Sequence, residues 1–160
     1  MLNLAYLVES SARRFPNETA LIDDDRRFSF RELQQGAARV AQALRGCGME
    51  PGDHVAMMMP NGPEFTIIYF GILYAGAVVV PLNYLLVPDE IAYHLEDSQA
   101  RAFFVHTSYA EAAHAAATLV AGELQLIVVG GGGAARRRAA LRVTHRPRLR
   151  PVRPGADHAG

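Results

Sequence analysis

The chain has 160 residues, half of them hydrophobic and a fifth charged, which is typical of a globular domain and excludes collagen, coiled coils and wholesale disorder. Cys47 is the only cysteine, so an intrachain disulfide and a cysteine-based zinc site are excluded. The zero net charge hides two unlike segments: residues 1–133 carry eight arginines against fifteen acidic residues, whereas residues 134–160 carry eight arginines against one, and lysine is absent throughout.

The N-terminal segment predicts a helix from about Asn3 to Arg14, ended by Pro16. The apolar residues near one face, which we expect to pack inward, are Leu4, Leu7, Val8 and Phe15. This segment lacks the positive start of a signal peptide, and Glu9 interrupts its apolar run, so we expect a cytoplasmic protein.

Two short strands, 19–22 and 27–30, are predicted on either side of an acidic turn. A second helix follows, because Ser29 and Glu32 have the spacing of a capping box. Apolar residues then recur at helical spacing as far as Leu44, and Gly46 and Gly48 provide the exit.

The middle of the chain alternates between apolar strands and helices. A buried strand is predicted over 54–59, a helix over 63–75 and a buried strand over 77–81. Residues 65–88 contain no charge and are long enough to span a membrane. However, Gly71, Gly76 and Pro81 interrupt the run, which favours the helix–turn–strand interpretation and no membrane span.

The pattern continues with a helix over 88–95, a strand over 102–105, a helix over 109–120 and a strand over 124–129. Helices alternating with apolar strands predict an α/β fold: a partial parallel sheet with helices on its faces. We therefore assign residues 1–130 to one domain. Residues 131–160, rich in Gly, Arg and Pro, are expected to form a disordered tail without a further strand.

Six sequence motifs follow one another along the chain: Phe28–Leu33, Gly48–Val55, Pro60–Phe65, Leu73–Asn83, Pro88–Ile91 and the apolar strand after Ala100-Arg101. In this order they resemble the N-terminal subdomain of the adenylate-forming (AMP-binding) ligases, and the acyl-CoA synthetases above all, over residues 1 to about 130. His54 stands where the family usually has arginine. Tyr74 replaces a lysine common in peptide-synthetase members, which favours the acyl-CoA synthetases.

The resemblance implies a full-length activity in which a carboxylic (fatty) acid reacts with ATP to give acyl-AMP, and coenzyme A then takes the acyl group. That chemistry requires a phosphate loop ending in lysine, an acidic residue for Mg²⁺ and a C-terminal lysine. In the family these groups lie beyond the resembling segment. We therefore expect a truncated chain that is inactive alone, needs no cofactor by itself, and has no assignable catalytic, cofactor-binding or metal residue.

Other candidate sites have simpler explanations. Gly130–Ala135 fits G-x-G-x-x-A, but it does not open a strand–helix–strand unit, so a flexible glycine run is favoured over a dinucleotide site. Cys47 is expected to be structural. The histidines lack metal-ligand spacing; they are His54, His94, His106, His114, His145 and His158.

Two functional interpretations remain open. One is the inactive N-terminal piece of an acyl-CoA synthetase, with an arginine-rich tail translated out of frame. The other is a small interaction module acting through a protein partner or, through its arginine-rich tail, nucleic acid. Nucleic-acid binding is the less favoured of these, because the family pattern stops abruptly where the tail begins, as an out-of-frame translation would make it do. The expected partners are a separately encoded ligase remainder or a second copy joined through exposed sheet edges.

Overall fold

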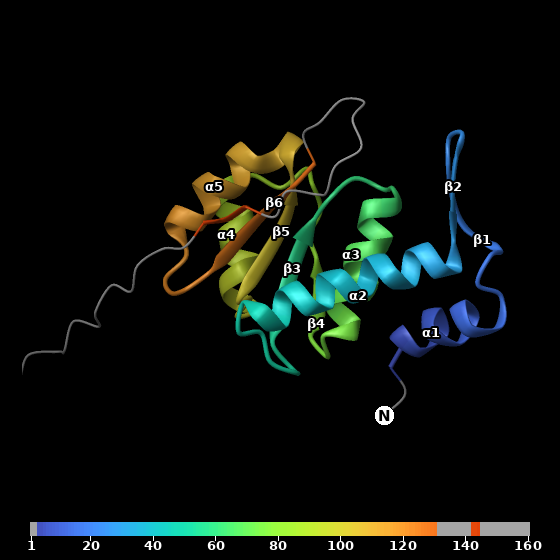
Figure 1. Cartoon of the computed structure of the whole chain (residues 1–160). Helices are drawn as coiled ribbons and strands as arrows, with labels where there is room; N and C mark the ends of the chain where they lie inside the picture. The colour runs from blue at the N-terminus through green and yellow to red at the C-terminus, as the bar shows by residue number, and fades with distance from the viewer. Residues whose placement is uncertain (1–2, 131–141, 145–160) are drawn as a thin grey trace, which may run out of the picture.

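The computed structural model describes residues 3–130 and 142–144 (Figure 1). In chain order its elements are α1 (Ala5–Arg14), β1 (Thr19–Asp23), β2 (Arg26–Ser29), α2 (Phe30–Gly46), β3 (His54–Met58), α3 (Pro63–Tyr74), β4 (Val78–Pro81), α4 (Pro88–Asp97), β5 (Ala102–His106), a 3₁₀ turn (Thr107–Tyr109), α5 (Ala110–Leu119), β6 (Gln125–Val129) and β7 (Arg142–Thr144).

The main sheet has the strand order β4-β3-β5-β6-β7. Strands β4, β3, β5 and β6 are parallel, and β7 joins β6 antiparallel. Strands β1 and β2 form a separate antiparallel hairpin, which stands apart from the main sheet (Figure 1). The predicted α/β class with a partial parallel sheet is therefore confirmed.

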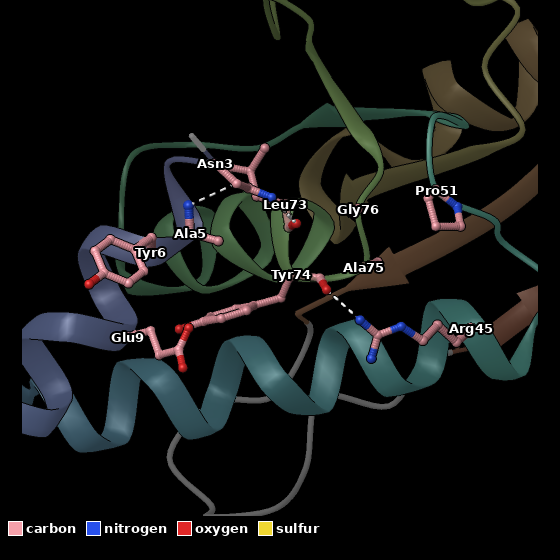
Figure 2. Close-up of a pocket in the computed structure, with 10 residues that line it drawn as sticks. All are labelled: Asn3, Ala5, Tyr6, Glu9, Arg45, Pro51, Leu73, Tyr74, Ala75 and Gly76. Atoms are coloured by element: carbon pink, nitrogen blue, oxygen red, sulfur yellow. Dashed lines mark hydrogen bonds between the residues drawn. The ribbon is translucent and has the colours of Figure 1, made fainter. Parts of the chain in front are cut away.

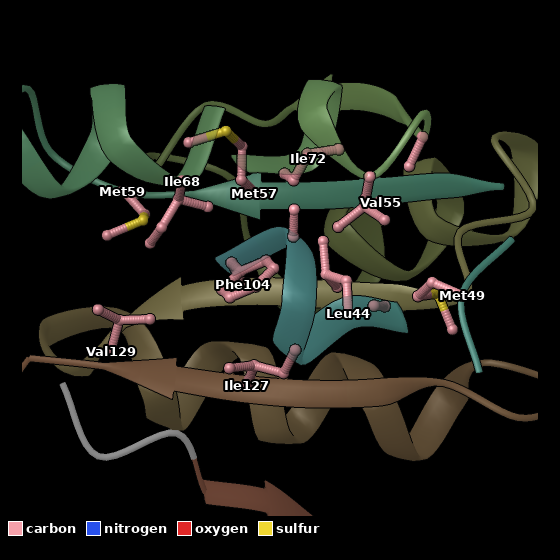
Figure 3. Packing of buried hydrophobic residues seen from close by; sticks show 14 residues of the cluster. Leu44, Met49, Val55, Met57, Met59, Ile68, Ile72, Phe104, Ile127 and Val129 are labelled. Carbon is pink, nitrogen blue, oxygen red and sulfur yellow. The ribbon is translucent and has the colours of Figure 1, made fainter. Parts of the chain in front are cut away.

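Helices cover both faces of the sheet. On one face α2 and α3 pack against Val55, Met57 and Phe104. On the other, α4 and α5 pack against Ala56, Phe103 and Val105. Consecutive residues of β3 and β5 are therefore buried on opposite faces, which explains why these strands are continuously apolar. Figure 3 shows the first of these two clusters, with Phe104 between the residues of β3 and β6.

The start of α2 follows the sequence prediction. The Ser29 hydroxyl accepts a hydrogen bond from the Glu32 backbone N–H, and the Glu32 carboxylate accepts one from the Ser29 backbone N–H at 2.8 Å. The Ser29 hydroxyl also donates to this carboxylate at 2.8 Å. The bonds that the carboxylate accepts from the Ser29 backbone N–H and hydroxyl lower the pKa of Glu32, since they favour its charged form. The capping box therefore satisfies two backbone donors at the helix start.

The buried face of α1 differs from the prediction. Its buried residues are Ala5, Val8 and Ala12, whereas Leu4, Leu7 and Phe15 are about half exposed. The small side chains of Ala5 and Ala12 let α1 pack closely against α2 and α3. The larger apolar residues are therefore left on the more exposed side of the helix. The predicted inward face was wrong except at Val8.

Two strand predictions also need correction. β4 is an edge strand of the described sheet, and Val78 is 44% exposed, so it is not the buried strand predicted for 77–81. Residues 142–144 form β7 on the edge of β6, so the prediction that no strand follows residue 130 was wrong there. The rest of the predicted tail lies outside the described residues.

Within residues 3–130 and 142–144, no helix has the length and apolar character needed to cross a membrane.

Candidate functional site

The sheet changes its winding direction between β3 and β5. The connection after β3 passes through α3 on one face and leads outward to β4, whereas the connection after β5 passes through α5 on the other face and leads to β6. In open α/β sheets, ligands bind at the carboxyl ends of the strands where the winding reverses. We therefore expect a ligand site at this edge.

Aromatic side chains meet at this edge from two different loops. Tyr84, three residues after β4, stacks on Tyr109, three residues after β5, with ring centroids 5.4 Å apart. His106, the last residue of β5, lies 6.2 Å from the Tyr109 ring. We call His106, Tyr84 and Tyr109 the carboxyl-edge cluster. In the sequence Tyr84 is 22 positions from His106 and 25 from Tyr109. The parallel arrangement of the strands brings them together.

The His106 ring has a defined orientation. Its Nδ1 accepts a hydrogen bond from the Ser108 backbone N–H at 3.2 Å, so a neutral ring carries its proton on Nε2. Nε2 faces Gly130, where an added Cβ would lie only 2.9 Å away. The cluster therefore presents a hydrogen-bond donor at the carboxyl ends of β5 and β6.

Gly130 is needed there for two reasons. Its φ of +92° lies in the left-handed region, and its missing side chain leaves room for His106. We predict that Gly130→Ala lowers the free energy of unfolding by about 1–3 kcal/mol, measured by urea denaturation.

Gly52→Ala is the matched control, since Gly52 has the same φ of +92° and no atom within 4 Å of an added Cβ. It isolates the backbone part of the effect. Equal losses in the two variants would show that His106 does not press on Gly130.

The other predicted candidates lie apart from this cluster. The Nδ1 atom of His54 is 2.5 Å from the Ser98 carbonyl, near the amino end of the sheet. His94 contacts Tyr93 edge-on, and His114 is on the exposed side of α5. Cys47 is the half-buried residue that caps α2. His145 and His158, and Gly130–Ala135 apart from Gly130, lie outside the described residues.

A cavity of about 500 Å³ lies at the opposite end of the sheet (Figure 2). It is bounded by α1, the ends of α2 and α3, and the turns before β3 and β4; its polar lining residues include Asn3, Tyr6, Glu9, Arg45 and Tyr74. The Asn3 amide donates to the Leu73 carbonyl at 3.0 Å, and Arg45 donates to the Tyr74 carbonyl. These bonds tie α1 and α2 to the end of α3.

Tyr74 is the unusual residue of this cavity. Its hydroxyl is buried and has no hydrogen-bond partner among the described residues. Burial raises the pKa of Tyr74, and the nearby Glu9 carboxylate raises it further, while Arg13 acts in the opposite direction. The phenol therefore stays neutral at physiological pH. Because the cavity lies at the amino ends of the strands, we favour the carboxyl-edge cluster as the functional site.

Comparison with known proteins identifies the family. The AMP-binding enzyme family matches residues 8–155, more than nine tenths of the chain. The chain belongs to this family. The match runs past residue 130, where the recognised sequence motifs stop.

Individual relatives are CoA ligases. A long-chain-fatty-acid–CoA ligase of Bacillus subtilis is 38% identical over 60% of this chain and 17% of its own length. A feruloyl-CoA synthase of Amycolatopsis is 40% identical over 71% of this chain and 22% of its own length. The chain thus spans about a fifth of the length of these relatives.

Solved structures agree with this assignment. A benzoate CoA ligase of Burkholderia xenovorans superposes with a TM-score of 0.75 at 31% identity, over 81% of this chain and 26% of that one. An anthranilate CoA ligase in complex with anthranoyl-AMP superposes with a TM-score of 0.77 at 30% identity, over 83% of this chain and 26% of that one. The resemblance to acyl-CoA synthetases predicted from the sequence is confirmed.

Sequence reasoning assigned no site residue and missed the carboxyl-edge cluster. One signal was available: His106 directly follows a predicted buried strand, where parallel sheets place functional side chains. Tyr84 carried no such signal, because its contact with Tyr109 can be inferred only from the order of the strands in the sheet.

Proposed function

We propose that this chain forms part of the N-terminal scaffold of an acid–thiol ligase. In that reaction a carboxylate oxygen attacks the α-phosphorus of ATP and pyrophosphate leaves; a thiol such as that of coenzyme A then attacks the acyl carbon and AMP leaves. The main support is the superposition of the parallel sheet and its helices on CoA ligases with TM-scores of 0.75 and 0.77. The relatives act on both fatty and aromatic acids by name, so we leave the acid open.

We further propose that the 160-residue polypeptide does not adenylate an acid by itself. Its sequence has no lysine, whereas charge developing on the triphosphate calls for preorganised cations. Mg²⁺ accompanies ATP in this family, yet the described residues contain no group of three acidic, histidine or cysteine side chains that could hold it. We therefore assign no step through the metal to these residues.

The carboxyl-edge cluster is proposed to border the reaction site once further segments complete it. The Nε2–H of His106 is a donor at that edge, and Tyr84 and Tyr109 offer an aromatic surface beside it. In this scheme the residues orient the bound acid or nucleotide and do not react with it.

A chimera tests these proposals. Residues 1–130 would replace the aligned segment of the Bacillus subtilis ligase, and carboxylate-dependent pyrophosphate exchange would be measured for the chimera and for the chain alone. We expect exchange by the chimera and none by the chain alone. His106→Ala in the chimera should lower kcat/KM by about tenfold or more, the loss that corresponds to one hydrogen bond of about 1.4 kcal/mol.

His114→Ala is the matched control, because His114 is an exposed histidine of α5 that is not part of the cluster. Exchange by the chain alone would refute the claim of inactivity. A folded chimera without exchange would refute the scaffold role, and equal effects of the two histidine variants would remove His106 from the site.

The interaction module remains the second candidate. Leu85 and Val87 follow Tyr84 and are 75% and 54% exposed, an apolar rim that a protein partner could cover. A soluble monomer that melts cooperatively, together with an inactive chimera, would favour this function.

A further inference from the structure

The described sheet has two edge strands, β4 and β7, and the outer edge of β4 is open to pairing. On the opposite side the sheet ends in β7, which covers the edge of β6. β4 pairs only with β3, in parallel, with Val78 opposite His54 and Pro81 opposite Met57. Any strand added beside β4 would have to use the backbone groups that point away from β3.

Two hydrogen bonds show which groups these are. The Val78 N–H donates to the Asp53 carbonyl and the Leu82 N–H donates to the Met57 carbonyl, both at 2.8 Å. Alternate residues of a strand point to opposite neighbours, so Val80 also faces β3 while Val79 and Pro81 face outward. Proline has no N–H, and the Ala77 N–H is used by the Ile72 carbonyl at 3.1 Å. Val79 therefore supplies the one outward N–H between Ala77 and Pro81.

The missing N–H of Pro81 is important because the residues before it have a high tendency to pair as strands. Residues 77–80 are Ala-Val-Val-Val, an uncharged run of high β propensity, and Val78 is 44% exposed. An exposed edge of this kind is a template for pairing with an identical strand. A proline on an edge strand removes a ladder hydrogen bond without disturbing the pairing on the inner side.

We propose that Pro81 closes the outer edge of β4 to pairing with a second copy of the chain. The inference is independent of the catalytic proposal, because it concerns only the backbone donors of one strand. It also concerns self-association through sheet edges, because Pro81, the residue that ends β4, opposes association at this edge.

Pro81→Val tests the proposal, since valine restores the N–H and suits a strand. In a symmetric pair each chain regains one donor, so we expect the dimer dissociation constant from sedimentation velocity to fall by about tenfold or more relative to wild type. Adding Val78→Lys to this variant should reverse the effect, because an edge lysine opposes pairing. Pro88→Val is the matched control, because Pro88 begins α4 and faces no strand edge.

Hydrogen exchange on the wild-type chain provides a second readout that needs no substitution. The Val79 amide should exchange rapidly and the Val80 amide slowly, since only the latter faces β3. The proposal fails if folded Pro81→Val associates no more strongly than wild type, or if Val79 is protected as strongly as Val80. If Pro81→Val does not fold, the exchange rates decide.

Discussion

Replacing Phe104 by alanine is expected to lower the free energy of unfolding by about 3–5 kcal/mol, a large share of the stability of an ordinary domain. Phe104 is 1% exposed and lies on β5, in the cluster that α2 and α3 cover (Figure 3). β5 is flanked by β3 and β6, so neighbouring strands restrict how far the cavity can collapse. Urea denaturation followed by circular dichroism measures the loss, with an unchanged m-value confirming that the folded state is retained.

Phe15→Ala is the control for the loss of a phenyl ring. Phe15 is 51% exposed, and the Arg14 guanidinium lies over its ring at 5.5 Å. Its loss should cost no more than about 1 kcal/mol, the usual scale of an exposed cation–π contact. Similar losses in the two variants would mean that the α2–α3 face of the sheet does not form the core described above.

The same burial explains why the fold could be predicted from the sequence. β3, β5 and β6 are buried on both faces, so each is a short continuous apolar run bounded by turns, and each was predicted within one residue of its observed ends. The capping box of α2 was predictable because its two hydrogen bonds are local, between Ser29 and Glu32.

The sequence predictions failed where burial or strand pairing depends on residues that are distant in the sequence. The inward face of α1 is set by close packing on α2 and α3, which favours Ala5 and Ala12 over Leu4 and Leu7. Edge and central strands contain similar residues, so the exposed position of β4 could not be inferred from Val78–Val80 alone. Residues 142–144 pair with β6 through backbone groups, which leave little trace in composition.

The candidate site was missed for a related reason. Tyr84 and Tyr109 stack because β4 and β5 end at the same edge of a parallel sheet. The chain order of the strands does not reveal their order in the sheet, since β3 lies between β4 and β5. A site built from loops of different strands can thus be located only after the topology is known.

Gly71→Ala is expected to destabilise the protein by about 2–3 kcal/mol, at the upper end of the usual cost of overpacking a core. An added Cβ would lie 2.5 Å from the Val40 Cβ and 3.1 Å from the Ala37 carbonyl oxygen, so α2 and α3 would have to move apart. The better helix propensity of alanine, about 1 kcal/mol, offsets only part of this cost. Thermal unfolding followed by circular dichroism measures the change.

Two glycines of α2, Gly46 and Gly36, provide a graded comparison with Gly71 of α3. A Cβ at Gly46 meets no atom within 4 Å, so Gly46→Ala should be neutral or stabilising by up to about 1 kcal/mol. A Cβ at Gly36 would lie 2.9 Å from Cγ2 of Ile67, a side chain that can shift, so Gly36→Ala should be intermediate.

A double-mutant cycle separates contact from propensity. Val40→Gly removes the atom that an alanine at position 71 would strike, so Gly71→Ala should cost less in that background than in wild type. An equal cost in both backgrounds would place the strain elsewhere. The predicted coupling would show that the close approach of α2 and α3, on which the covered face of the sheet depends, requires a residue without a side chain at position 71.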